Sequence, residues 1–142
     1  GYNYRLEGIQ GAVLGVKLKH LAHWTRERQR VATRYAELLA DTPLQLPTVT
    51  AGNESAWHLY TVRSPRRDEL KKHLDANGIG NAVHYPMPLH LQKVYAPLGY
   101  KPGDFPAAEK ASREVLSLPM FPELTDAQIQ RVAAVVKEFF AH

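Results

Sequence analysis

The sequence of 142 residues contains no cysteine, which excludes disulfide scaffolds, thiolate metal sites and cysteine nucleophiles. No uninterrupted apolar run approaches the roughly 20 residues that a helix needs to cross a bilayer, so we expect no membrane-spanning segment. The basic start and apolar run of a secretory signal are also absent, and we expect a cytoplasmic protein. With 44% apolar and 23% charged residues, the composition is typical of a folded domain.

Several motifs of enzyme sites are missing as well. The sequence has no P-loop, no G-x-G-x-x-G and no G-x-S-x-G, although composition alone leaves a serine–histidine–aspartate set open. Seven histidines are present, but neither the pair His20/His23 nor the pair His84/His90 has a carboxylate at zinc-like spacing. We therefore expect no metal site.

Positive charge is in moderate excess. Eighteen Lys and Arg residues against fourteen Asp and Glu residues give a formal charge of +4, with the densest basic clusters at residues 26–30 and 63–67. A continuous basic stripe would indicate a nucleic-acid surface. Scattered arginines are more typical of solvated helix faces and of anion steering, so we expect no nucleic-acid partner and keep a basic nucleic-acid-binding domain as an alternative.

Apolar residues at helical spacing predict a long helix from Leu6 to about Leu39, with a kink or break near residues 22–25, where a polar stretch begins. At 1.5 Å per residue this helix would extend roughly 50 Å, which is longer than a domain of this size needs. We therefore expect part of it to pack against something outside this chain.

The remainder of the chain alternates between strand and helix patterns. Strands are predicted at residues 56–62, 79–84 and 116–118, a helical turn at 91–97, and helices at 66–76, 106–116 and 127–140. This order predicts an α+β domain with helices on one side of a small sheet.

A first polar segment that could carry chemistry is GYNYR at residues 1–5. Asn3 and Arg5 offer several hydrogen-bond donors, which suit an anionic group near the start of a helix. The alternative is that the two side chains cap the helix and bind water.

A second polar segment is NAVHYPMPLH at residues 81–90. Its prolines stiffen the loop, so His84, Tyr85 and His90 could be presented to a ligand with little ordering cost. A structural corner whose aromatic rings fill the core explains the same residues equally well, and the segment alone leaves both alternatives open.

Both segments belong to an ordered series of short motifs that spans nearly the whole chain. The series includes GYNYRL at 1–6, IQGA at 9–12, RQR at 28–30, WHLY at 57–60, GI at 78–79, HYPMPLHLQ at 84–92, GY at 99–100, FPAAE at 105–109 and LSLPMFPEL at 116–124. Each motif is weak by itself. In this order and spacing they resemble the C-terminal domain of the DegT/DnrJ/EryC1/StrS family of pyridoxal-phosphate-dependent sugar aminotransferases.

The resemblance implies that residues 1–142 form a single domain, the small C-terminal domain of a fold-type-I enzyme. Such a domain has a long N-terminal helix followed by a small, mostly antiparallel sheet covered by helices. A large upstream domain, absent from this chain, would bind pyridoxal 5'-phosphate through a Schiff-base lysine. None of the eight lysines of this chain stands in that motif, so the chain contains no catalytic residue and is expected to be inactive alone.

The resemblance also implies an activity. Family members work as homodimers and transfer an amino group, usually from glutamate, to a keto group on a nucleotide-linked sugar, for polysaccharide or antibiotic sugar biosynthesis. Some relatives replace the lysine and act as dehydratases instead. A further alternative is that the chain is a stand-alone binding or dimerisation module.

Site residues follow from the motifs that match the family. Asn3 would reach the cofactor phosphate of the neighbouring subunit, with Arg5 beside it. His84 and Tyr85 would line the sugar-nucleotide pocket, and His90 is assigned to the same pocket.

Overall fold

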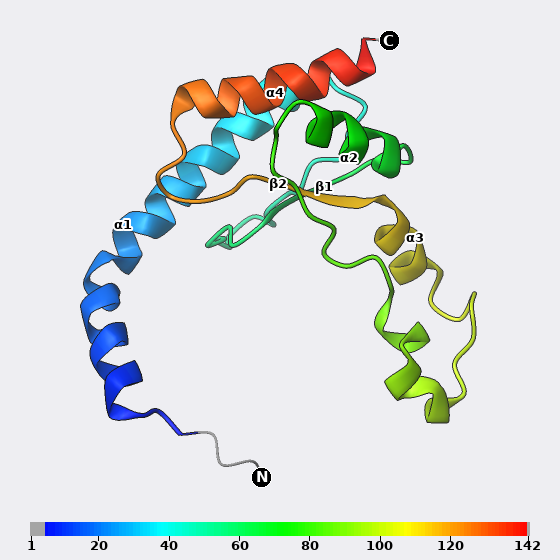
Figure 1. The fold of residues 1–142 in the computed structure, drawn as a ribbon, viewed down its shortest axis with the longest axis horizontal. Helices are drawn as coiled ribbons and strands as arrows, with labels where there is room; N and C mark the ends of the chain where they lie inside the picture. Colours follow the sequence, from blue (N-terminus) through cyan, green and yellow to red (C-terminus); the bar gives the residue numbers. More distant parts are fainter. Residues whose placement is uncertain (1–4, 142) are drawn as a thin grey trace.

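The fold is that of an arch in which two limbs descend from a packed centre (Figure 1). The computed structural model describes residues 5–141. In chain order its elements are α1 (Gly8–Leu39), β1 (Tyr60–Arg63), α2 (Arg67–Ala76), the 3₁₀ helices η1 (Leu89–Leu91) and η2 (Lys93–Leu98), α3 (Pro106–Glu114), β2 (Val115–Leu118) and α4 (Asp126–Phe140). The first half of α1 forms one limb, and the segment with η1 and η2 forms the other.

The sheet at the centre is two-stranded and antiparallel. Its register is Tyr60↔Leu118, Thr61↔Ser117, Val62↔Leu116 and Arg63↔Val115. Side chains alternate between the two faces of a strand, so the first and third pairs of this register point to the same face. All four of their residues are apolar and buried: Tyr60, Val62, Leu116 and Leu118. The opposite face carries Thr61 and Ser117, and the candidate site lies on that side.

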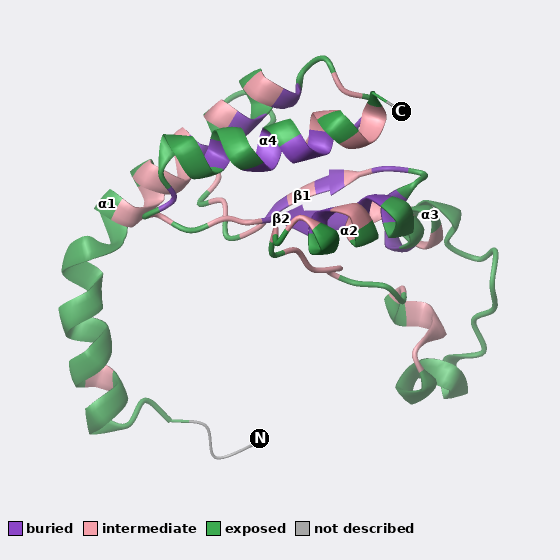
Figure 2. Ribbon diagram, turned by 45° about the horizontal axis from the view of Figure 1, so that its top comes forward, coloured by how far each residue is buried: buried purple, intermediate pink, exposed green. Residues whose placement is uncertain are grey.

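Helices cover the apolar face of the sheet. The second half of α1, together with α2 and α4, contributes its buried residues to one cluster, in which the largest fully buried side chains include Tyr35, Leu39, Leu70, Leu74 and Ile129. Figure 2 shows this burial along α4, the sheet and α2, whereas both limbs are largely exposed. The predicted α+β fold, with a long first helix and a small antiparallel sheet covered by helices, is confirmed.

The predicted strand at residues 56–62 is wrong in its first half. The strand begins only at Tyr60, and Trp57 adopts a left-handed backbone conformation (φ 48°), which lies outside the β region and interrupts a regular strand there. One guanidinium nitrogen of Arg28 donates to the carbonyl oxygens of Trp57 and His58 at 3.3 and 3.4 Å. A contact with α1 therefore satisfies backbone groups that strand pairing would otherwise use.

The predicted strand at residues 79–84 is reduced to one isolated bridge, between Ala82 and Ser117. The Asn81 side chain donates to the carbonyl oxygen of Ile79 at 3.0 Å and to the carboxylate of Asp75 at 2.8 Å. These local bonds tie the segment to the end of α2, and pairing with β2 begins only after them.

Helix α1 is continuous over 32 residues, so the predicted kink or break near residues 22–25 is not a break; Figures 1 and 2 show instead a change of direction about half-way along the helix. Residues 12–23 are all exposed, whereas buried positions begin at Val31. Leu14, Leu18 and Leu21 each keep more than half of their surface exposed. The first half of the helix thus carries an apolar face that the rest of the described chain does not cover.

Arginines of both basic clusters form hydrogen bonds between distant segments of the chain, although a solvated helix face was expected for them. Arg28 donates to the carbonyl oxygen of Met120 at 2.9 Å. Arg30 donates to the carbonyl oxygen of Leu124 and to the carboxylate of Asp126, both at 2.7 Å. In the second cluster, Arg67 is buried and donates to the carbonyl oxygens of Ser112 and Val115 at 3.3 and 3.2 Å. These contacts fasten α1 to the start of α4, and α2 to the junction of α3 and β2.

Candidate functional site

The His84 side chain lies against the polar face of the sheet. Backbone hydrogen bonds between Ala82 and Ser117 place the chain beside β2 just before His84. His84 Nδ1 and Ser117 Oγ share a hydrogen bond of 3.0 Å, and Ser117 Oγ lies 2.9 Å from Thr61 Oγ1. Two hydroxyl groups of the sheet therefore orient the imidazole through Nδ1, so Nε2 is the nitrogen that a ligand would meet.

Tyr85 stands next to this imidazole and is largely solvent-exposed. The two rings meet edge to face with their centroids 5.4 Å apart, and 71% of Tyr85 is exposed. Both residues line a pocket of about 260 Å³, whose other lining residues are Met87, Pro88, Leu89, Gln92, Ala108, Ala111, Ser112 and Val115. The pocket thus joins the loop after His84 to one face of α3.

His90 is placed differently from His84 and Tyr85. Its Nε2 lies 3.1 Å from Glu109 Oε1, and its ring packs on Phe105 with centroids 4.8 Å apart. Only 8% of its side chain is exposed. His90 lines a second cavity of about 360 Å³, formed with Leu89, Tyr95, Leu98, Tyr100, Phe105 and Ala108. The structure therefore brings His84 and Tyr85 into one pocket and His90 into its neighbour.

Glu109 is the charged partner of His90. The same Oε1 atom accepts a hydrogen bond from the backbone N–H of Gly103 at 2.7 Å. The Gly103 N–H in the first place, and then the His90 side chain, hold the pKa of the Glu109 carboxyl below its ordinary value. The carboxylate is therefore kept in its ionised, accepting form.

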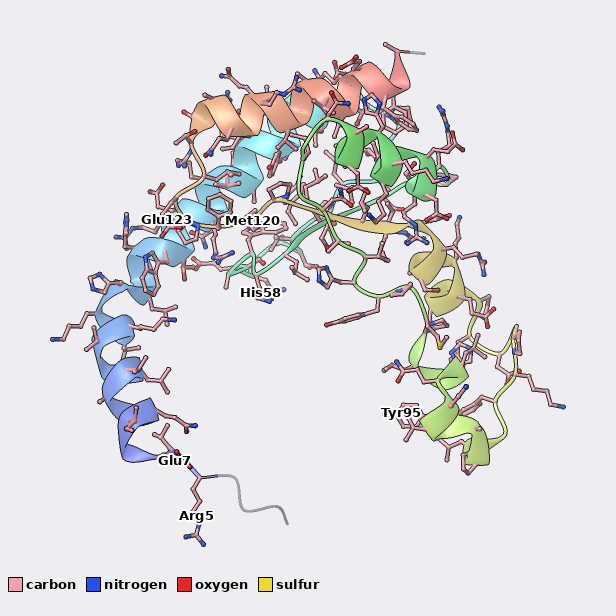
Figure 3. The ribbon with its side chains drawn as sticks, in the orientation of Figure 1. Arg5, Glu7, His58, Tyr95, Met120 and Glu123 are labelled. Atoms are coloured by element: carbon pink, nitrogen blue, oxygen red, sulfur yellow. The ribbon has the colours of Figure 1, made fainter. Side chains whose placement is uncertain are left out.

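Of the predicted phosphate-binding pair, Asn3 lies outside the described residues. Arg5 is exposed, and Figure 3 shows it at the free end of the α1 limb, away from Tyr95 on the opposite limb. Arg5 is not among the residues that line the His84–Tyr85 pocket. The first turn of α1 is closed by a capping box between Glu7 and Gln10, in which the Glu7 N–H donates to Gln10 Oε1 at 3.3 Å. The exposed guanidinium of Arg5 carries hydrogen-bond donors of the kind that suit a phosphate group.

A third hollow runs along the α1 limb. This groove, of about 600 Å³, is mostly apolar, and its lining includes Leu14, Leu18, Leu21, Trp24, His58 and Pro122. It lies on the side of α1 that faces the segments 56–58 and 122, so it continues the uncovered face of the helix into the fold.

Sequence reasoning missed the groups that hold the histidines. Ser117 stands in the LSLPMFPEL motif and Glu109 in the FPAAE motif, so both were visible as motif members, but no spacing rule links them to residues 33 and 19 positions away.

Within residues 5–141, His, Asp and Glu side chains form no group of three or more that could hold a metal ion. None of the helices in the same range combines the length and apolar character needed to cross a membrane.

The fold and the site define a class: an α+β domain with a pocket on the Thr61–Ser117 side of its sheet. The sequence profile described as the DegT/DnrJ/EryC1/StrS aminotransferase family matches residues 1–137. The chain belongs to this family, and the resemblance read from its motifs is confirmed.

Individual relatives agree with the family match. The chain is 48% identical to the "Pleiotropic regulatory protein" of Geobacillus stearothermophilus, covering 100% of this chain and 39% of that protein. It is 44% identical to the dTDP-3-amino-3,4,6-trideoxy-alpha-D-glucose transaminase of Streptomyces venezuelae, covering 98% and 37%. The X-ray crystal structure of S. venezuelae DesV in complex with a ketimine intermediate superposes with a TM-score of 0.96 at 43% identity, covering 100% and 38%. The chain thus spans less than two fifths of the length of these relatives.

Proposed function

We propose that the chain is the C-terminal part of a pyridoxal-phosphate-dependent aminotransferase, which transfers an amino group from glutamate to a keto group on a nucleotide-linked sugar. The observation that carries this proposal is the family match over residues 1–137, together with a preformed pocket at the His-Tyr motif. The 44% identity to a dTDP-amino-sugar transaminase supports a nucleotide-linked substrate. The cysteine-free sequence agrees with the reducing cytoplasm as the place of action.

The division of labour follows from the positions of the residues. Pyridoxal phosphate, bound mainly by the large domain of the whole protein, supplies the electron sink for amino transfer. In a homodimer, Arg5 together with Asn3 would hold the cofactor phosphate of the neighbouring subunit. The position of Arg5, at the free end of a limb and outside the lining of the His84–Tyr85 pocket, supports a role toward another subunit.

His84 and Tyr85 would orient the sugar nucleotide. Since Ser117 engages Nδ1, the imidazole offers Nε2 to a sugar hydroxyl or a phosphate oxygen. The exposed Tyr85 phenol offers a second hydrogen bond, and its ring a surface for stacking. Orientation by fixed groups of this kind lowers the entropy cost of reaching a reactive geometry.

The substrate side of the proposal is tested in the full-length protein. We expect amino transfer from glutamate to a dTDP- or UDP-linked keto sugar, measured as 2-oxoglutarate release. His84→Ala and Tyr85→Phe should raise the KM for the sugar nucleotide about tenfold, the value of one lost hydrogen bond to a charged or well-ordered partner. Lys72→Ala, an exposed change on α2, serves as the control. Wild-type protein without any amino transfer to such sugars would overturn the proposal.

The cofactor side needs its own measurement. Asn3→Ala and Arg5→Ala in the full-length protein should weaken pyridoxal phosphate binding about tenfold each, followed by the visible absorption of bound cofactor during dialysis. Unchanged cofactor affinity in both variants would remove this segment from the phosphate site. A mixed dimer can be made from one subunit that carries Asn3→Ala or Arg5→Ala and one subunit that lacks the cofactor-binding lysine. Its cofactor affinity shows whether the segment contacts the phosphate in its own subunit or in the neighbouring one.

A further inference from the structure

The His84–Tyr85 pocket has two walls that belong to different parts of the chain. One wall is the segment from His84 to Gln92, and the other is the face of α3 that carries Ala108, Ala111 and Ser112. Between the two walls the chain makes the excursion of η2 and the loop 99–105. Local sequence therefore does not fix the distance between the walls, and contacts across the excursion must do so.

Apolar burial contributes little to holding this excursion. Residues 93–108 are all exposed, and Val94 and Leu98 keep 73% and 63% of their surface in solvent. A segment with so little buried surface opens locally at low cost unless specific polar contacts restrain it.

One carboxylate supplies such contacts at both ends of the excursion. Glu109 projects from α3 beside Ala108, a residue that lines both the pocket and the neighbouring cavity. Its Oε1 meets His90 Nε2 at 3.1 Å, just before the excursion begins, and the Gly103 N–H at 2.7 Å, just before it ends. The side chains of His90 and Glu109 are only 8% and 12% exposed, so water competes weakly for these bonds.

We propose that Glu109 is a positioning residue for the substrate pocket: by binding His90 and Gly103 together, it holds the Tyr85–Leu89 wall at its working distance from α3. His90 then acts as the other half of this clamp rather than as a group that touches the sugar nucleotide. The inference rests on the proposed function only for the identity of the ligand, since the clamp itself is a property of the fold.

The test uses the full-length protein with its cofactor bound. Glu109→Ala should raise the KM for the sugar nucleotide ten- to a hundredfold, the range that a misplacement of about 1 Å produces, and leave the KM for glutamate within about twofold. Glu109→Gln keeps an Oε1 that accepts both hydrogen bonds, so it should restore the KM to near the wild-type value. Glu138→Ala, at an exposed glutamate of α4, is the matched control.

A double-mutant cycle and hydrogen exchange complete the test. Glu109→Ala combined with His90→Ala should cost little more than either change alone, because both break one clamp. The Gly103 amide should exchange at least tenfold faster in Glu109→Ala than in the wild type or in Glu109→Gln. Unchanged Gly103 exchange, additive effects, or equal losses for both substrates would overturn the clamp. If the wild type transfers no amino group, the proposed function fails while the exchange measurement still decides the clamp.

Discussion

Ser117 shows how one hydroxyl in the sheet reaches the site. It is 3% exposed and stands between Thr61 and His84, so Ser117→Ala removes the only described partner of His84 Nδ1 within residues 5–141 and leaves the Thr61 hydroxyl without this bond. We expect a loss of about 1–2 kcal/mol in the free energy of unfolding, measured by urea titration. The His84 ring nitrogens should lose their single tautomer in NMR spectra. Thr48→Ala, in an exposed loop, should change neither quantity. An unaltered His84 spectrum in Ser117→Ala would contradict the orientation of His84 by the Ser117 hydroxyl.

Two buried tyrosines offer a contrast between a satisfied and an unsatisfied hydroxyl. Tyr35 Oη donates to the carbonyl oxygen of Pro119 at 3.0 Å, whereas Tyr60 Oη has no hydrogen-bond partner among residues 5–141. Burial raises the pKa of Tyr60 to about 12 and that of Tyr35 further. Tyr35→Phe should therefore cost about 1 kcal/mol, while Tyr60→Phe should be neutral or stabilising, both by thermal and urea unfolding. Equal losses in both variants would contradict this difference.

Glu109 should also make stability depend on pH. Its carboxyl has a folded-state pKa below the ordinary value of 4.5, so the unfolded chain binds a proton more readily than the folded one. The stabilisation is therefore complete above the unfolded value and is lost as the pH falls through the folded value. Urea titrations from about pH 6 to about pH 3 should show a smaller acid-induced loss in Glu109→Gln than in the wild type. Parallel curves for the two proteins would contradict the shifted carboxyl.

At the scale of elements, the helices were predictable because residues that favour a helix start or end stand next to them in the sequence. Thr125 forms a capping box with Gln128 at the start of α4, and Pro106 occupies the first turn of α3, so residue types that favour a helix start stand at both places. The strands depended on contacts between distant segments. Trp57 leaves the strand because Arg28, on another element, binds its carbonyl group, and α3 stops at Glu114 because Val115 pairs with Arg63. Neither event has a local signal.

The same distinction explains the site. The proline-stiffened loop alone left a ligand site and a structural corner equally open for His84 and Tyr85, and the family motif assigned them to the substrate; the structure places both residues in the lining of one pocket. The hydrogen bond with Ser117 that orients His84 was not predictable, because it is apparent only once the register of β1 and β2 is known. His90 was assigned to the substrate pocket by its motif, whereas its burial against Glu109 depends on how α3 packs.

Helix α1 should behave as two elements in solution. Its second half is buried from Val31 onward and is fastened by Arg28 and Arg30, while residues 12–23 are exposed. An isolated helical stretch of this length is marginal in water. In the chain of residues 1–142, amides 10–22 should therefore exchange at least a hundredfold faster than amides 31–39. Uniform protection at low protein concentration would contradict this, and protection that grows with concentration would indicate self-association through the apolar face.

At the scale of the whole molecule, the buried residues lie in the centre of the arch, and the limbs are largely exposed. The packed centre holds the core, while Arg5 stands at the free end of one limb, and the His84–Tyr85 pocket lies between the segment 84–92 and α3, which carries the Glu109 clamp. The groove along the first limb presents Leu14, Leu18 and Leu21 to solvent. Such a continuous apolar surface is typical of a contact with another polypeptide.

This division predicts that the isolated chain folds and yet does not transfer amino groups. The core of residues 31–136 is formed by contacts within the chain, so urea should unfold it in one cooperative transition observed by Trp and Tyr signals. Amino transfer requires a lysine-bound cofactor in an enclosed pocket, and the family resemblance assigns that role to none of the eight lysines of this chain. With pyridoxal phosphate, glutamate and a nucleotide-linked keto sugar, the chain should therefore release 2-oxoglutarate no faster than free cofactor does. The full-length protein is the positive control, and turnover by the isolated chain above that background would show that this domain carries a cofactor site of its own.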